Sequence, residues 1–193
     1  NHDQAKKNSN LLFKQYPSNV DLFITVGVLF LQNKKYEDAI KVFQKVISLN
    51  PKEVNTYHNL GIAWTQLNNI DEAIACYSKA EKLDSKNSLT YYNYGFLCSK
   101  KLEYKQAIDK LNKAIKLNSN VSKYYYNLAE YLTKLGEYEK AINNYKKIIT
   151  IDPNHLRAKY NLSRLQLATE NFKEGWKNFH LRFEYSEIKY SPQ

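Results

Sequence analysis

Residues 54–87 read VNTYHNLGIAWTQLNNIDEAIACYSKAEKLDSKN and contain the unit from which the chain is built. Tyr57, Leu60 and Trp64 follow one another at the spacing of one helix face. Two asparagines then interrupt the pattern, and acidic residues begin a second helix, where the helix dipole favours them. The apolar stripe of this second helix consists of Ala73, Ile74, Tyr77, Ala80 and Leu83. The stretch therefore predicts a helical hairpin.

The hairpin returns with a fixed period. Alanine recurs every 34 residues, at Ala5, Ala39, Ala73, Ala107 and Ala141. Glycine keeps the same step in another phase, at Gly27, Gly61 and Gly95. A fixed period of this length is typical of solenoids, because each unit buries its apolar face against its neighbours. We expect the small residues to lie where the helices cross closely, since a larger side chain would overpack the contact.

These residues resemble the tetratricopeptide repeat, whose period is 34 residues. The resemblance implies an all-α fold, a right-handed α-solenoid of about five and a half helical hairpins. The expected divisions are a truncated repeat at 1–19, repeats at 20–53, 54–87, 88–121 and 122–155, a variant closing repeat at 156–187, and a tail at 188–193.

Both ends of the chain carry a further expectation. The chain begins in the middle of a unit and contains no methionine, which indicates a fragment of a longer protein. Near the other end, a set of five residues resembles a closing repeat of bacterial repeat proteins that often carry a transferase domain. The set consists of Phe172, Gly175, Trp176, Phe179 and Arg182. Trp176 and Phe179 either cap the stack with apolar bulk or have a direct role.

The composition is that of a folded protein without a membrane helix. Of the 193 residues, 43% are hydrophobic and 25% charged, and no apolar run approaches the roughly 18 residues that a membrane helix needs. We expect a cytoplasmic location. Cys76 and Cys98 occupy unrelated repeat positions, which favours free buried thiols over a disulfide or a ligand pair.

No pattern of catalytic residues is visible. The four histidines are scattered without a second ligand at metal spacing, and packing or turns account for all five glycines, which leaves none for a phosphate-binding loop. We therefore expect that this fragment is not itself an enzyme and has neither a cofactor nor a metal site, while an attached domain could be catalytic.

A binding function must then come from the free face of the first helices. In tetratricopeptide folds these helices line a concave groove. Position 6 of successive repeats gives Asn59, Asn93, Asn127 and Asn161. An asparagine amide offers both an acceptor and donors and can pair with a peptide bond. This asparagine ladder resembles that of the O-linked N-acetylglucosamine transferase repeats, which hold extended polypeptides by their backbones; alternatively, each amide satisfies a polar group of a neighbouring repeat.

Other free positions would complete the groove. The neighbouring tyrosines Tyr92, Tyr126 and Tyr160 would form its wall or serve packing. The first half is apolar, with Val28, Ile62, Leu89 and Phe96. The second half is basic, with Lys123, Lys134, Arg157 and Arg164, and Glu130 is the only acid among them. These positions predict an extended ligand, part apolar and part acidic. The resemblance to transferase-linked repeats implies that such a ligand would be presented to an attached transferase domain. The carboxylate clamp of some family members is disfavoured, because Ile24 and Val28 occupy its positions.

Two alternatives come from other classes of function. The net charge of +10 would suit nucleic acid or another anionic surface. The distribution of charge disfavours nucleic acid, because many lysines are expected on the outer face of second helices: Lys41, Lys45, Lys79, Lys82, Lys110, Lys113, Lys116, Lys146 and Lys147. The second alternative is self-association through the initial half-repeat or the Trp176 end, because an uncapped solenoid end exposes apolar surface.

Overall fold

The computed structural model describes residues 11, 13–83 and 85–182. It contains two compact units, residues 1–86 and 87–193, and each is considered by itself. Across the described ranges the regular structure is helical, without a strand, which confirms the predicted all-α class. The truncated repeat expected at 1–19 falls mostly outside the described residues; Leu11 and residues 13–15 are helical.

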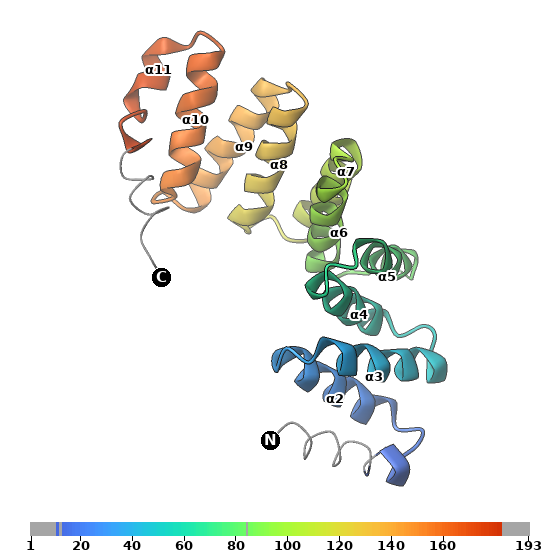
Figure 1. Ribbon diagram of the computed structural model, residues 1–193. Helices are drawn as coiled ribbons and strands as arrows, with labels where there is room; N and C mark the ends of the chain where they lie inside the picture. The colour runs from blue at the N-terminus through green and yellow to red at the C-terminus, as the bar shows by residue number, and fades with distance from the viewer. Residues whose placement is uncertain (1–10, 12, 84, 183–193) are drawn as a thin grey trace. The chain divides into compact units, whose positions relative to one another are not determined.

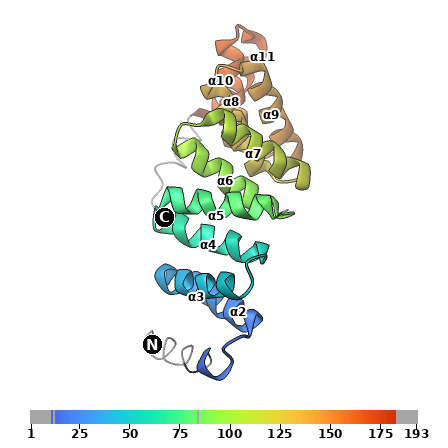
Figure 2. The same ribbon diagram turned by 90° about the vertical axis from the view of Figure 1, so that its right-hand side faces the viewer.

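The first unit contains two helical hairpins. They are formed by α2 (Val20–Gln32), α3 (Tyr36–Leu49), α4 (Val54–Gln66) and α5 (Ile70–Lys82). Figures 1 and 2 both show α2 beside α3 and α4 beside α5. The core of the first hairpin includes Phe23, Val26 and Phe30 of α2 and Phe43 and Val46 of α3, all buried.

The second unit repeats this arrangement three times. Its helices are α6 (Ser88–Lys100), α7 (Tyr104–Leu117), α8 (Ser122–Lys134), α9 (Tyr138–Ile151), α10 (Leu156–Ala168) and α11 (Phe172–Lys177). Consecutive helices pack against each other throughout this unit, which makes it a short α-solenoid. The first helices of its three hairpins are α6, α8 and α10.

The turn inside each hairpin has one backbone design. A residue with positive φ follows each first helix: Lys34, Asn68, Leu102, Gly136 and Glu170, with φ between 57° and 76°. The next amide donates to a carbonyl five residues earlier, as Asn69 does to Trp64 at 2.9 Å and Glu137 to Leu132 at 2.9 Å. A left-handed residue is a common end of a helix. The 34-residue period is thus kept in the turns, although only one of the five residues is glycine.

Small residues permit the close helix crossings. Ala39, Ala73, Ala107 and Ala141 are 0% exposed. A Cβ added to Gly61 would lie only 2.7 Å from Cε1 of the buried Tyr77 ring. The first and second helices of a hairpin therefore meet at a glycine or alanine, as the sequence predicted.

Several further predictions can be compared with the structure. Cys76 and Cys98 are free and buried, as expected, and burial raises the pKa of the Cys76 thiol to about 12. The expectation of an exposed lysine was wrong for Lys110, which is 8% exposed and places its ammonium 4.8 Å from the centroid of the Tyr94 ring. The aliphatic stem of a lysine can be buried while its charge meets an aromatic face. In the described ranges, no helix has the length and apolarity needed to cross a membrane.

The two kinds of glycine should respond differently to alanine. Gly61→Ala is expected to lower the free energy of unfolding by about 1 to 3 kcal/mol through overpacking against Tyr77. Gly136→Ala is expected to cost about 1 to 2 kcal/mol through its positive φ alone, because no described atom lies within 4 Å of the new Cβ. Urea unfolding followed by circular dichroism measures both. A second change, Tyr77→Leu, should reduce the cost at Gly61 and leave the cost at Gly136 unchanged; equal effects on both would contradict the packing role.

Candidate functional site

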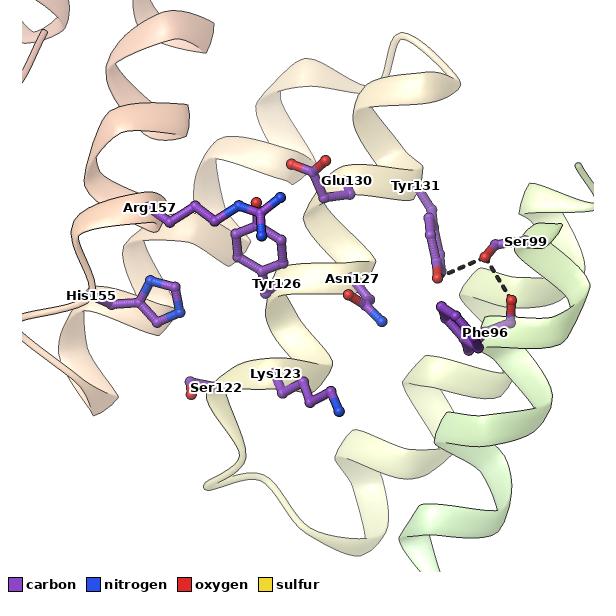
Figure 3. Close-up of a pocket in the computed structure, with 10 residues that line it drawn as sticks. All are labelled: Phe96, Ser99, Ser122, Lys123, Tyr126, Asn127, Glu130, Tyr131, His155 and Arg157. Atoms are coloured by element: carbon purple, nitrogen blue, oxygen red, sulfur yellow. Dashed lines mark hydrogen bonds between the residues drawn. The ribbon is translucent and has the colours of Figure 1, made fainter. Parts of the chain in front are cut away.

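A surface hollow of about 490 Å³ lies in the second unit, beside α8. We call it the α8 hollow. It is lined by Phe96, Ser99, Ser122, Lys123, Tyr126, Asn127, Glu130, Tyr131, His155 and Arg157. Figure 3 shows side chains of three successive first helices, α6, α8 and α10, turned toward this space. The hollow therefore exists only because three hairpins are stacked.

The floor of the hollow is one face of α8. Lys123, Asn127 and Glu130 are separated by four and then three residues, which places them on the same side of a helix. Figure 3 shows them in a row along α8, with Asn127 in the middle. The floor thus runs from a cation through an amide to a carboxylate.

The amide of Asn127 has a partner inside the protein. Its Nδ2 donates to the Tyr92 hydroxyl of the preceding repeat, at 3.2 Å. The next asparagine does the same, because Nδ2 of Asn161 donates to the Tyr126 hydroxyl at 2.9 Å. The amides of Asn127 and Asn161 therefore satisfy polar groups of a neighbouring repeat, which was one of the two interpretations open from the sequence. Asn59 and Asn93 make no hydrogen bond through their side chains within the described ranges.

A second hydrogen-bond network surrounds Glu130, at the carboxylate end of the floor. Oε1 of Glu130 accepts a hydrogen bond from Asn161 Nδ2 at 3.0 Å and another from the hydroxyl of Tyr145. Burial, followed by the hydrogen bond to Glu130, raises the pKa of Tyr145. The phenol thus stays protonated and continues to donate, which holds the Glu130 carboxylate in place.

Cations lie over the tyrosine rings of this unit. Lys123 Nζ is 4.8 Å from the centroid of the Tyr92 ring, and Arg157 Cζ is 4.9 Å from that of Tyr126. The Tyr126 ring also stacks on His155, with centroids 5.7 Å apart and planes at 17°. Each cation comes from the repeat that follows its tyrosine, so cation–π contacts help to fix both cations at the hollow.

The wall of the hollow that α6 forms is more apolar than the floor. Phe96 of α6 is 37% exposed, and the hydroxyls of Ser99 and Tyr131 lie 2.8 Å apart behind it. Ser99 also donates to the Phe96 carbonyl at 2.7 Å. Burial is the main cause that raises the pKa of Tyr131. This wall offers an aromatic surface whose polar groups are already hydrogen-bonded to one another.

The structure brings together only part of the predicted groove. Of the predicted residues, Phe96, Lys123, Tyr126, Asn127, Glu130 and Arg157 line the α8 hollow. Tyr92 lies beneath it, 7% exposed. Outside its lining in the second unit are Asn93, Lys134, Tyr160, Asn161 and Arg164, and Asn59 and Ile62 belong to the first unit. Arg164 lies over Tyr160, with Cζ 5.8 Å from the ring centroid.

Four lining residues were not predicted: Ser99, Ser122, Tyr131 and His155. His155 precedes α10, where its Nδ1 accepts from the Ala158 amide at 3.1 Å and caps the helix. Ser99 and Tyr131 stand 32 residues apart rather than 34, so the repeat register gave no signal for their pairing. In the described ranges, no three histidine, cysteine, aspartate or glutamate residues are grouped where they could hold a metal ion.

Comparison with known families agrees with the helical hairpins. Residues 54–87 and 122–155 match the tetratricopeptide repeat family, and residues 27–67 match a family described as TPR repeat. These segments are tetratricopeptide repeats. No curated protein matches the chain.

Solved structures share this fold. YrrB, a TPR protein with an unusual peptide-binding site, has a TM-score of 0.81 at 19% identity, with 91% of each chain covered. The MamA protein has a TM-score of 0.78 at 27% identity, with 90% of this chain and 96% of that chain covered. MamA from Desulfovibrio magneticus RS-1 has a TM-score of 0.77 at 19% identity, with 89% of this chain and 97% of that chain covered. The tetratricopeptide solenoid is therefore the fold of this chain, and the fold is typically non-catalytic.

The hydrogen bonds of the asparagines predict unequal effects on stability. Asn161→Ala should lower the free energy of unfolding by about 1 to 2 kcal/mol, because it removes a donor to a partly buried carboxylate and phenol. Asn59→Ala is the matched control and should change it by less than about 0.5 kcal/mol. Urea unfolding of Asn161→Ala, Tyr126→Phe and the double variant gives their coupling energy, expected at about 0.5 to 1.5 kcal/mol. Additive effects would show that the inter-repeat hydrogen bond contributes nothing.

Proposed function

We propose that this protein is a protein–protein interaction module that binds an extended polypeptide segment in the α8 hollow. The tetratricopeptide repeats and the solved neighbours support the interaction module. One observation carries the choice of site. Three successive repeats contribute cationic, amide and aromatic groups to a single hollow of about 490 Å³, a volume in the range of ligand pockets.

The chemistry of the walls supports a ligand that is part apolar and part acidic. Phe96 offers an exposed aromatic face, and burial of such a face favours an apolar side chain of the ligand. Lys123 and Arg157 offer positive charge at the same hollow. Because cation–π contacts already order both side chains, an acidic group would meet charges that lose little conformational freedom on binding.

The asparagines contribute less than a ladder of bidentate amides would. Asn127 Nδ2 is engaged by Tyr92, and this leaves Oδ1 as the group best suited to accept a backbone N–H of the ligand. We therefore assign most of the affinity to the aromatic wall and the cations. A groove shared by all four asparagines is not part of this proposal.

A role as the substrate-selecting arm of a transferase is a second proposal. It rests on the closing-repeat resemblance. The rings of Trp176 and Phe179 pack edge-on, with centroids 5.2 Å apart. Arg182 Cζ lies 4.7 Å from the centroid of the Phe179 ring. These contacts support a packed end of the last hairpin; Trp176 remains 60% exposed. Mass determination of the natural full-length protein, followed by its sequence, would test whether a transferase domain accompanies the repeats.

Peptide binding should depend on the aromatic wall and on the basic residues of the hollow independently. The probe is a fluorescein-labelled peptide, Ala-Phe-Ala-Glu-Glu-Ala, titrated with the protein and followed by fluorescence anisotropy. Phe96→Ala should weaken binding by about 1 kcal/mol through lost apolar contact, and Lys123→Gln by about 0.2 to 1 kcal/mol through a lost ion pair. Lys134→Gln removes the same charge from α8 outside the hollow and should have no effect beyond that of net charge.

Two results would contradict the proposed function. One is binding that Lys134→Gln weakens as much as Lys123→Gln, because the net charge alone would then explain it. The other is tighter binding of an oligothymidylate than of the peptide, with a steep loss of affinity in salt, as counterion release from nucleic acid requires.

A further inference from the structure

The floor of the α8 hollow carries two opposite charges that do not meet. Lys123 and Glu130 are seven residues apart on one helix, which returns them to the same face about 10 Å apart along the axis. Both line the hollow, and Figure 3 shows them at opposite ends of the row formed with Asn127. This separation is too long for an ion pair between them.

Neither charge is neutralised by another charged group in the described ranges. The printed contact of Lys123 is with the face of Tyr92, and no carboxylate pairs with it there. Glu130 accepts hydrogen bonds at Oε1 from Asn161 and Tyr145, both uncharged, and no cation in this part of the chain lies within ion-pair distance of it. The floor therefore presents a fixed positive end and a fixed negative end.

The supports under the floor keep this polarity in place. Tyr92 holds the Asn127 amide through Nδ2 at 3.2 Å, and Asn161 holds the Glu130 carboxylate at 3.0 Å. Both supporting residues belong to repeats adjacent to α8. The dipole of α8 has the same sense, because the amino-terminal end of a helix is its positive end.

We propose that the α8 hollow selects polypeptide segments that carry an acidic and a basic side chain three residues apart. This inference rests on the proposed function and names its ligand more closely. In the polyproline II conformation, residues i and i+3 lie on the same side and about 9 Å apart, which matches the floor. The acid pairs with Lys123, the base with Glu130, and a backbone N–H between them donates to Oδ1 of Asn127.

Charge complementarity favours this ligand over a uniformly acidic one. A second acidic group at the far end would approach the Glu130 carboxylate, whose Oε1 is fixed by two hydrogen bonds. Arg157 lies over Tyr126 on the side wall and adds positive charge there. Figure 3 shows its guanidinium beside the Tyr126 ring, nearer in that view to Glu130 than to Lys123. The acidic end of the ligand therefore depends on Lys123, and the basic end depends on Glu130.

Three labelled probes separate these possibilities: Ala-Glu-Pro-Ala-Lys-Ala, Ala-Glu-Pro-Ala-Glu-Ala and Ala-Lys-Pro-Ala-Lys-Ala, each acetylated and amidated. The alanine between the charged residues supplies the backbone N–H that a second proline would lack. Affinities are measured by fluorescence anisotropy at low salt with the full chain, Glu130→Gln and Lys123→Gln. Glutamine keeps an acceptor for Asn161 and Tyr145, so the fold of α8 is preserved. Lys134→Gln and Glu139→Gln are matched controls that make the same charge changes outside the hollow.

The mixed-charge probe should bind the natural protein most tightly. Glu130→Gln should weaken it about two- to fivefold, as for a partly exposed ion pair, and should strengthen binding of the doubly acidic probe. Lys123→Gln should weaken the mixed probe by a similar factor, and the control variants should leave the ratio between probes unchanged.

Failure of this inference can be told apart from failure of the proposed function. If the doubly acidic probe binds most tightly and Glu130→Gln leaves the ratio of probes unchanged, the mixed-charge inference is overturned while peptide binding at Lys123 stands. If no probe responds to either variant, both are overturned.

Discussion

The close approach of the two helices in each hairpin is the constraint on which the rest of this structure depends. The first helices contribute small residues to these crossings: Gly27 lies against the Phe43 ring, Gly61 against the Tyr77 ring and Gly95 against the Ala107 carbonyl. The recurring alanines of the second helices have no exposed surface. Since a side chain of ordinary size cannot occupy these crossings, the spacing of the helices is fixed. The left-handed residue after each first helix fixes the length of the turn. Together these two features set the 34-residue register.

The register in turn builds the site. A tyrosine of one repeat and an asparagine of the next, 35 residues later, come within hydrogen-bond distance on two successive occasions in the second unit. The same tyrosines receive a cation from the following repeat. The polar groups at the α8 hollow are therefore ordered by contacts between repeats. Such preorganisation lowers the conformational cost of binding a flexible ligand.

The sequence predicted the helical hairpins, the buried alanines and six of the residues that line the hollow. It did so because helix periodicity and the repeat step are local and additive properties. It did not predict His155, Ser99 or Tyr131, because their roles depend on a helix cap and on a contact out of repeat register. The exposed surface expected for Lys110 was wrong for a similar reason, since the Tyr94 ring that covers the lysine comes from another helix.

The sequence by itself determined the helical hairpins and their 34-residue step, because the period, the small residues and the apolar stripes leave one way to bury the core of a hairpin. Only the tertiary structure decided what the free face offers. An amide can equally satisfy a neighbour or hold a ligand, and this choice depends on whether a phenol lies within about 3 Å of it. Asn59 and Asn161 occupy the same repeat position but have different chemical surroundings. The Tyr126 hydroxyl accepts a hydrogen bond from Asn161, whereas no phenol within the described residues bonds the side chain of Asn59.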